Sequence, residues 1–304
     1  MLAAFFLYDA VLYTEEIRFQ GMRTMGESIE ATTTLQNSIQ MPWLGLGVLH
    51  IPDGEVIEQV VQWALECDYR SIDTAAVYKN ETGIGAALHK AVVPRDEIFL
   101  TTKLWNSDQG YESTLQAFQA SLQRLGTDYV DLYLIHWPGP DASKFIDSWR
   151  ALESLYKAGK ARAIGVSNFQ VHHLEPLLQE SEIPPMVDQI EFHPHLQQPE
   201  LIEFCVDQGI QVEAWRPIMK GDVINIELLQ ELGKKYGKTP VQVTLRWIIQ
   251  RGFIAIPKSQ DRDRIRDNAN VFDFQLESDE IEQIDALDIG HRLGPDPDTF
   301  DLDF

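Results

Sequence analysis

The sequence predicts an α/β protein, a (β/α)8 TIM barrel with an N-terminal β-hairpin closing the bottom and a C-terminal helix and tail. From residue 43 onward, short apolar runs alternate with longer amphipathic segments. Apolar residues recur every three or four positions in the longer segments, which is the period of a helix. Strands that are buried on both faces and alternate with helices favour a parallel sheet. Eight such units close into a barrel.

The strands are predicted from eight short apolar runs. In chain order these runs are residues 44–48, 70–75, 98–104, 129–136, 161–167, 186–192, 210–215 and 253–257. The helices between and after them are predicted at residues 54–67, 81–92, 110–126, 143–159, 170–180, 199–209, 224–237, 239–252 and 261–269. Several end with a glycine that follows a basic or amide residue, which is a common way to stop a helix.

The two ends of the chain are predicted to lie outside the eight repeats. Residues 33–42 contain two short runs around Asn37 and Ser38 and indicate a hairpin. Residues 1–34 are expected to be a poorly ordered N-terminal extension, and residues 35–304 a single barrel domain. The first 13 residues are apolar, but Asp9 interrupts them and they are too short to span a bilayer. Residues 277–288 predict one more helix, followed by a tail rich in Pro and Asp. We expect this tail to be mostly solvated surface, with the alternative that the tail, Trp105 and Trp137 border a pocket.

Composition restricts the partners of the protein. Its formal net charge is -22 and its pI is about 4.6, which disfavours nucleic acid or an anionic membrane surface as the main partner. Any anionic ligand therefore needs a local basic site. The two cysteines, Cys67 and Cys205, are far apart and have no ligand cluster near them, which is typical of reduced thiols in a cytoplasmic protein.

Polar side chains collect at the C-terminal ends of the predicted strands, where barrels of this kind carry their active sites. Asp73 ends the second strand, Tyr78 follows in its loop, Lys103 ends the third strand and His136 ends the fourth. Each has a plain structural alternative: Asp73 and Tyr78 as a strand cap with a loop, and His136 as a hydrogen-bonded core histidine. Lys103 is harder to explain in this way, because an ammonium in an apolar strand needs an anion beside it.

The four side chains together suggest acid catalysis at a carbonyl group. A phenol titrates near ~10 and is a reluctant acid at neutral pH. We expect the Lys103 cation to lower the pKa of Tyr78, with Asp73 holding the ammonium in place. Tyr78 then acts as general acid while His136 orients the carbonyl oxygen by a second hydrogen bond.

Successive motifs of this chain resemble those of the aldo-keto reductases. They are SIDTAAVYKNETGIGAAL, TTKLW, VDLYLIHWP, AIGVSNF, VDQIEFHPHLQQPEL and IPKSQDRDRIRDN, and they occur in order across about residues 36 to 304. The resemblance is strongest to the bacterial branch that includes 2,5-diketo-D-gluconic acid reductases and glyoxal or methylglyoxal reductases.

The resemblance implies an NADPH-dependent reductase of aldehydes and ketones, acting without metal or flavin on a small-molecule carbonyl substrate, as a cytoplasmic monomer. Tyr78 would be the proton donor, tuned by Lys103 and Asp73, and His136 would place the substrate. The nicotinamide would be bound by Ser167, Asn168 and Gln189 and would stack on Trp215. The adenosine phosphate would be bound by Lys258, Ser259, Arg264 and Asn268, and the substrate pocket would include His136, Trp105 and Leu49.

Three residues or segments depart from the family pattern. Arg216 stands where a small residue is usual near the pyrophosphate, and we expect it to change that contact. Leu49 replaces an aromatic residue after the first strand, which makes the pocket less aromatic. The segment after the seventh strand, residues 219–222, is short, so we expect no long belt over the cofactor.

Other readings of the motifs stay open or are set aside at this point. A barrel of this family that binds NADPH as a regulatory subunit is one alternative, and a hydrolase using two carboxylates is another, with Glu191 and Glu213 available. His193 and His195 resemble a metal pair but have no matching ligands on other strand ends. The GxG at residues 83–85 lacks the third glycine of a dinucleotide-binding fingerprint.

Overall fold

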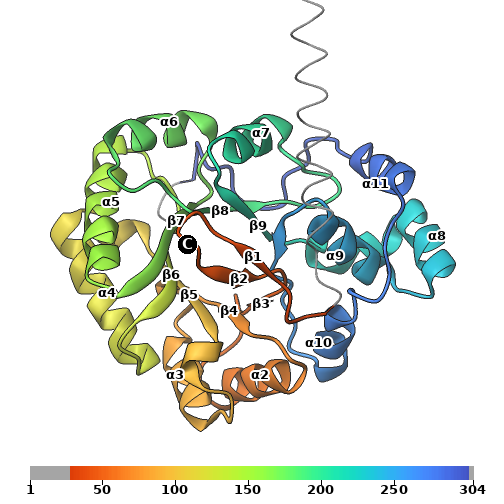
Figure 1. Cartoon of the computed structure of the whole chain (residues 1–304), viewed down its shortest axis with the longest axis horizontal. Coiled ribbons are helices and arrows are strands. Elements are labelled where there is room, and N and C mark those ends of the chain that lie inside the picture. The colour runs from red at the N-terminus through yellow and green to blue at the C-terminus, as the bar shows by residue number, and fades with distance from the viewer. Residues whose placement is uncertain (1–27, 301–304) are drawn as a thin grey trace, which may run out of the picture.

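The structure, a computed structural model, describes residues 28–300 (Figure 1). Most of the expected N-terminal extension, residues 1–27, lies outside the described residues, as do residues 301–304. The hairpin begins earlier than the boundary that we placed at residue 34. Its strands are β1, Thr32–Thr34, and β2, Gln40–Pro42, and they pair antiparallel.

The central sheet has eight parallel strands in sequential order, and the predicted strands are confirmed. They are β3 (Leu46–Gly47), β4 (Ser71–Asp73), β5 (Phe99–Leu104), β6 (Val130–Ile135), β7 (Ala161–Ser167), β8 (Val187–Glu191), β9 (Gln211–Trp215) and β10 (Ile254–Ala255). Parallel bridges from Leu44 to Ala255 and from Gly47 to Lys258 join the first strand region to the last. The sheet therefore closes into the expected barrel.

The predicted helices surround the strands, as Figure 1 shows. They are α2 (Glu55–Glu66), α3 (Glu81–Lys90), α4 (Tyr111–Leu125), α5 (Ala142–Lys157), α6 (Val171–Glu180), α7 (Pro199–Asp207), α8 (Glu227–Tyr236), α9 (Pro240–Gln250), α10 (Arg262–Ala269) and α11 (Ser278–Asp285). Short 3-10 segments are η1 (Ala76–Tyr78), η2 (Arg95–Glu97), η3 (Asn106–Asp108) and η4 (Met219–Asn225). The η4 segment delays the start of α8 to Glu227, three residues later than we predicted.

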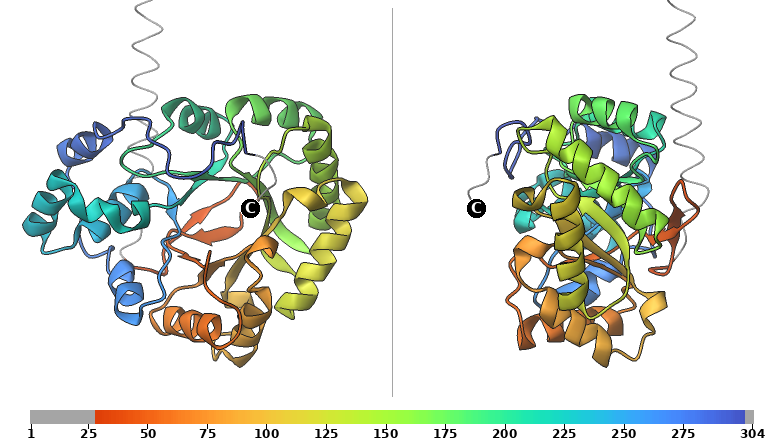
Figure 2. Two further views of the ribbon diagram at one scale, coloured as in Figure 1. Left: turned by 180° about the vertical axis from the view of Figure 1, so that it is seen from behind. Right: turned by 90° about the vertical axis from the view of Figure 1, so that its left-hand side faces the viewer.

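The hairpin and the C-terminal tail cover opposite ends of the barrel. In the right-hand view of Figure 2 the red hairpin lies at one end of the barrel and the blue tail at the other. The hairpin is tied to the barrel by the side chains of Gln36 and Asn37, which donate to the backbone carbonyls of Gly209 and Arg162. The tail end is the end to which β4, β5 and β6 point, so the candidate residues lie there.

Close packing of β7 and β8 depends on one glycine. A Cβ on Gly165 would lie 2.4 Å from the carbonyl oxygen of Val187, a distance that real structures do not tolerate. The missing side chain lets the two strands approach and sets the relative heights of Ser167 and Gln189, which are directly paired in the ladder. This local feature positions two of the candidate residues.

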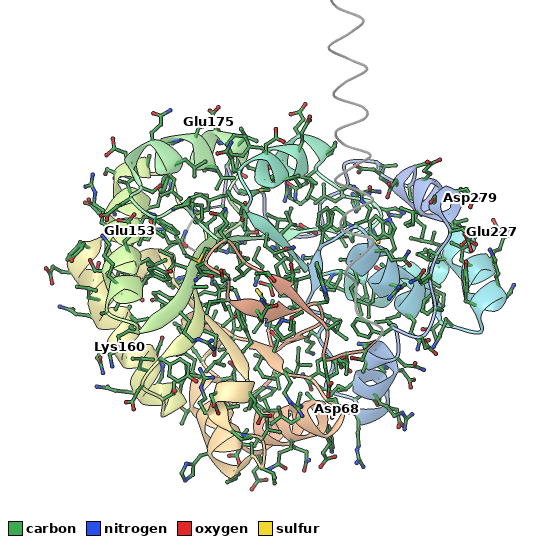
Figure 3. All side chains as sticks on the ribbon, viewed as in Figure 1. Asp68, Glu153, Lys160, Glu175, Glu227 and Asp279 are labelled. Carbon is green, nitrogen blue, oxygen red and sulfur yellow. The ribbon has the colours of Figure 1, made fainter. Side chains whose placement is uncertain are left out.

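The surface carries the charge that the composition predicts. Figure 3 labels the acidic side chains Asp68, Glu175, Glu227 and Asp279 on outer helices and loops, and all four are exposed. Within residues 28–300, the helices are all too short or too polar to cross a membrane.

Candidate active site

A buried ion pair forms the centre of the site. Asp73 ends β4 and Lys103 lies in the neighbouring strand β5, and both side chains are almost fully buried. Lys103 Nζ donates to Asp73 Oδ1 at 2.7 Å, to Asp73 Oδ2 at 2.8 Å and to the carbonyl of Thr74 at 2.9 Å. The ammonium thus has the anion that its apolar strand requires. Asp73 raises the pKa of Lys103 against the opposing effect of burial, so the cation stays charged.

Tyr78 reaches this pair from η1. Lys103 Nζ lies 5.2 Å from the centroid of the Tyr78 ring. Our expectation of a lowered pKa for Tyr78 is wrong in direction. Burial of the phenol raises its pKa and outweighs the lowering effect of Lys103. Tyr78 is therefore a protonated phenol at neutral pH, which is the state that a proton donor needs.

His136 follows β6 and faces Tyr78 and Trp105. Its ring centroid lies 5.6 Å from that of Tyr78 and 5.2 Å from that of Trp105, both in edge-on geometry. Burial, and then the Lys103 cation, hold the pKa of His136 well below its usual value. The imidazole is therefore neutral at working pH and can donate one hydrogen bond without carrying charge. The alternative of a fully hydrogen-bonded core histidine does not fit, because Nδ1 is buried and has no partner among the described residues.

The residues expected around the nicotinamide form one connected network. Asn168, in the left-handed region at φ 64°, uses both amide hydrogens, one to the His136 carbonyl at 2.9 Å and one to Ser167 Oγ at 3.0 Å. Ser167 donates to the Gln189 carbonyl at 2.8 Å, and Trp215 Nε1 donates to Asn168 Oδ1 at 2.8 Å. The donors of Ser167 and Asn168 are therefore engaged within the protein, and the acceptor Oδ1 of Asn168 holds the indole of Trp215 in place.

Gln189 connects this network to the ion pair and to a residue whose place in the site sequence reasoning missed. Its Nε2 donates to Asp73 Oδ2 at 2.8 Å and to Glu213 Oε2 at 2.7 Å. Glu213 lies in β9, is completely buried and pairs in the ladder with Gln189. The sequence suggests Glu213 only as one of two acids of a hydrolase. A signal was present, because a glutamate in the middle of the buried strand IQVEAW requires a polar partner inside the barrel.

Glu213 is a neutral acid at pH 7. Burial, and then the nearby Asp73 carboxylate, raise its pKa from the usual 4.5 to about 8. Between these two values the unfolded chain releases this proton while the folded protein keeps it. Rising pH across this window therefore stabilises the unfolded state, and the free energy of unfolding falls.

We expect Glu213→Gln to remove this pH dependence, since an amide does not titrate. The melting temperature of the variant minus that of the wild type should be larger at about pH 8 than at about pH 5. Thermal unfolding at both pH values measures the difference. An identical difference at both values would contradict a raised pKa for Glu213.

The residues expected to bind a phosphate lie together after β10. Lys258 and Arg264 are exposed, whereas Ser259 and Asn268 are buried. Ser259 Oγ accepts a hydrogen bond from the backbone N–H of Asp261. The side chain of Asp261 caps α10 by accepting a hydrogen bond from the backbone N–H of Arg264. Burial lowers the pKa of Lys258.

The arginines of α10 differ in their partners. Arg262 pairs with Glu66, and Arg266 pairs with Asp263 and Asp267. The guanidinium of Arg264 forms no ion pair with any side chain of residues 28–300. Of these three cations, Arg264 is therefore the one left to meet an external anion.

The C-terminal tail packs over the mouth of the site, beside Trp105 and Trp137, the two residues that we expected to border the pocket with it. The Phe300 ring stacks on Trp137 with centroids 4.3 Å apart and meets the Trp105 ring edge-on at 6.0 Å. Leu49, the other expected pocket residue, is half-buried in the loop after β3. Aromatic side chains from the tail and from two strand ends therefore form one wall of the mouth.

Glu191 and Arg216 hold the base of this tail. Glu191 is completely buried and accepts the backbone N–H groups of Leu293 at 2.8 Å and of Gly294 at 3.0 Å. Arg216 donates to the carbonyl of Leu293 and lies over the Trp215 ring. Its guanidinium is therefore engaged by the tail. A Cβ on Gly294 would lie 2.3 Å from Trp215, so only glycine allows the tail to sit directly on this indole.

One group of metal-ligand type occurs within residues 28–300, and it does not include His193 or His195, the pair that we set aside as a metal site. His172, His173 and Asp298 bring ligand atoms within 4.8 Å of one another. His173 Nδ1, however, accepts the backbone N–H of Gln170, which leaves the proton of the neutral ring on Nε2, the atom that faces Asp298. That nitrogen has no lone pair to offer a metal. His193 instead hydrogen-bonds Glu191.

Comparisons with known proteins agree with this geometry. The profile of the Aldo/keto reductase family matches residues 44–289. Glyoxal reductase of Bacillus subtilis (strain 168) is 54% identical over 274 residues, which cover 90% of this chain and 99% of the relative.

Solved structures give the same result. MGS-M4, an aldo-keto reductase from a Medee basin deep-sea metagenome library, is 44% identical with a TM-score of 0.87, and the match covers 89% of this chain and all of that one. A mutant of Gox0644, solved in complex with NADPH, is 42% identical with a TM-score of 0.84, over 89% of this chain and 98% of the other.

Proposed function

The chain belongs to the aldo/keto reductase family, and on this basis we propose that Tyr78 is the proton donor in its reduction of small carbonyl compounds to alcohols. The protein is an oxidoreductase that takes NADPH as cofactor and acts on carbonyl groups. NADPH supplies the hydride. The observation that carries the proposal is the pair Lys103 and Asp73 beside a protonated Tyr78.

The residues present fit this cofactor. The indole of Trp215 is fixed by Asn168 and offers a flat apolar surface for a nicotinamide ring. The oxygen Oε1 of Gln189 accepts no hydrogen bond from the described residues, and it can accept one from a carboxamide. The guanidinium of Arg264, which forms no ion pair with the described residues, and the ammonium of Lys258 fit the 2′-phosphate.

Tyr78 and His136 have different roles at the carbonyl oxygen. Tyr78 transfers its phenolic proton to this oxygen as negative charge develops on it, and the Lys103 cation stabilises the phenolate that remains. The neutral imidazole of His136 donates a second hydrogen bond and sets the orientation of the substrate. Asp73 keeps Lys103 charged.

We propose small 1,2-dicarbonyls such as glyoxal and methylglyoxal as the first substrate class. The mouth supports this choice because Phe300, Trp137 and Trp105 narrow it with apolar rings, and a dicarbonyl without a carboxylate needs no cation there. The relative named glyoxal reductase supports it independently. Absorbance of NADPH during turnover of methylglyoxal and of a diketogluconate panel tests the choice. Faster turnover of the diketogluconates at equal concentration would overturn it.

Keto-sugar acids are the second candidate, and a hollow beside Trp105 favours them. It has a volume of about 520 Å³ and is lined by Ala76, Val77, Lys79, Thr82, Trp105, Asp108 and Arg124. Arg124 is already paired with buried Glu81. Lys79 is exposed and forms no ion pair within residues 28–300, so it is the cation available to a substrate carboxylate.

The packing of the tail leads to a prediction about selectivity. Ending the chain after Gly294 keeps the contacts to Glu191 and removes Phe300 from Trp137. We expect rates on sugar-derived carbonyls to rise relative to methylglyoxal, because the mouth widens, while the Kd for NADPH stays within about twofold. Steady-state rates and cofactor titration measure both. Equal loss on every substrate would assign the tail a structural role.

We further propose that the barrel is one domain and acts as a cytoplasmic monomer. A single hydrophobic cluster runs from Leu35 to Ile284, which supports one domain. Cys205 is buried, Cys67 is half-buried and both are free thiols, which supports a reducing compartment.

A further inference from the structure

Glu213 is a buried acid that the reaction described above does not use. Both of its oxygens are inside the barrel, and Oε1 has no hydrogen-bond partner among the described residues. A carboxyl in such a place is destabilising relative to an apolar side chain of similar volume. The only side-chain hydrogen bond that it makes within residues 28–300 is the one that it accepts from Gln189.

The two acids around Gln189 determine how its amide is turned. Asp73 Oδ2 lies 2.8 Å from Nε2, and Glu213 Oε2 lies 2.7 Å from the same atom. An ionised carboxylate cannot donate, so Asp73 excludes the flipped amide, in which Oε1 would face it. Nε2 therefore gives one hydrogen to each acid, and Oε1 points away from both as an acceptor.

The hydrogen bonds of Asn168 and Ser167 determine which role is left to Gln189. Asn168 and Ser167 use their donors on backbone and side-chain oxygens within the protein. Gln189 Oε1 accepts no bond within residues 28–300, so it is available to an N–H of a bound ligand. The primary carboxamide of nicotinamide offers such an N–H.

We propose that Glu213 is a positioning residue for the cofactor: it takes the second amide hydrogen of Gln189 and thereby holds Gln189 Oε1 toward the carboxamide N–H of the nicotinamide. The inference rests on the proposed nicotinamide site. It explains why a costly acid lies at this place in the barrel. Without Glu213, Asp73 alone holds the amide, and Gln189 rotates about that single hydrogen bond.

The test compares NADPH with its reduced 3-acetylpyridine analogue, in which a methyl group replaces the carboxamide NH2. For Glu213→Leu we expect the Kd of NADPH to rise about three- to tenfold, the value of one hydrogen bond. The Kd of the analogue should change less than about twofold, because it has no N–H for Gln189 to bind. Glu213→Gln should restore most of the NADPH affinity, since its amide oxygen accepts the same hydrogen.

Asp188→Asn is the matched control. Asp188 precedes Gln189 on the same strand and is equally buried, but its side chain faces away, near Cys205. The Asp188→Asn substitution should leave the dissociation constants of NADPH and of the analogue unchanged. Glu213→Met serves if Glu213→Leu does not fold, because it keeps the length of the side chain.

Three outcomes would overturn the inference. An equal loss of affinity for NADPH and for the analogue would mean that Glu213 acts on the fold alone. Unchanged NADPH affinity in a folded Glu213→Leu or Glu213→Met protein would mean that Gln189 needs no second acid. A wild-type protein that binds NADPH and the analogue equally would show that Gln189 does not bind the carboxamide. The proposed reduction chemistry is tested separately, through Tyr78.

Discussion

Tyr78→Phe is expected to lower carbonyl reduction by about 10²- to 10⁴-fold while NADPH still binds with nearly wild-type affinity. The substitution removes the phenolic proton and leaves the ring against His136 and Lys103. The developing negative charge on the carbonyl oxygen then lacks its proton donor. Steady-state turnover of methylglyoxal and fluorescence titration with NADPH measure the two effects.

Tyr133→Phe is the control for this substitution. Tyr133 is a fully buried tyrosine on β6, three residues before His136, and it packs against Phe118, away from the ion pair. Loss of its hydroxyl should leave turnover unchanged. Full turnover in Tyr78→Phe would refute the assigned proton donor, and loss of NADPH binding would indicate a disturbed pocket instead.

Arg264→Ala is expected to weaken NADPH binding by about tenfold or more and to leave the affinity for NADH almost unchanged. A charge-assisted hydrogen bond contributes roughly 1.5 to 3 kcal/mol, and each 1.4 kcal/mol is a factor of about ten in Kd. NADH lacks the 2′-phosphate that this guanidinium would meet. The effect should also decrease at high salt, because the side chain is exposed.

Arg266→Ala gives the matched comparison within the same helix. Arg266 is paired with Asp263 and Asp267. Its removal should therefore change the Kd of neither cofactor by more than about twofold. Dissociation constants for NADPH and NADH in the wild type and both variants complete the test. If Arg264→Ala weakens both cofactors equally, the phosphate lies elsewhere.

The barrel itself follows from periodicity in the sequence. Strand and helix periods are local properties, and eight alternating units with polar residues at the strand ends restrict the chain to one architecture. The motifs then placed Asp73, Tyr78, Lys103 and His136 at one end of the barrel. The structure brings these four together, because β4, β5 and β6 are neighbours in the order that the sequence predicts.

The direction of the Tyr78 pKa is a property of the tertiary structure. The sequence identifies a lysine near the phenol, and a nearby cation alone lowers a phenol pKa. Burial of the ring by residues distant in sequence raises it more. Burial is a sum over all neighbours in space, and no local pattern reports that sum.

The surroundings of Glu213, Arg216 and the tail were also decided only by the fold. Gln189 meets Asp73 across the barrel, a separation of 116 residues in sequence, and Glu191 meets Gly294 across 103 residues. Sequence determined which residue types stand at each strand end. Which of them touch depends on closure of the sheet and on the path of the tail, because a hydrogen bond forms over about 3 Å and this distance is set by every strand between the partners.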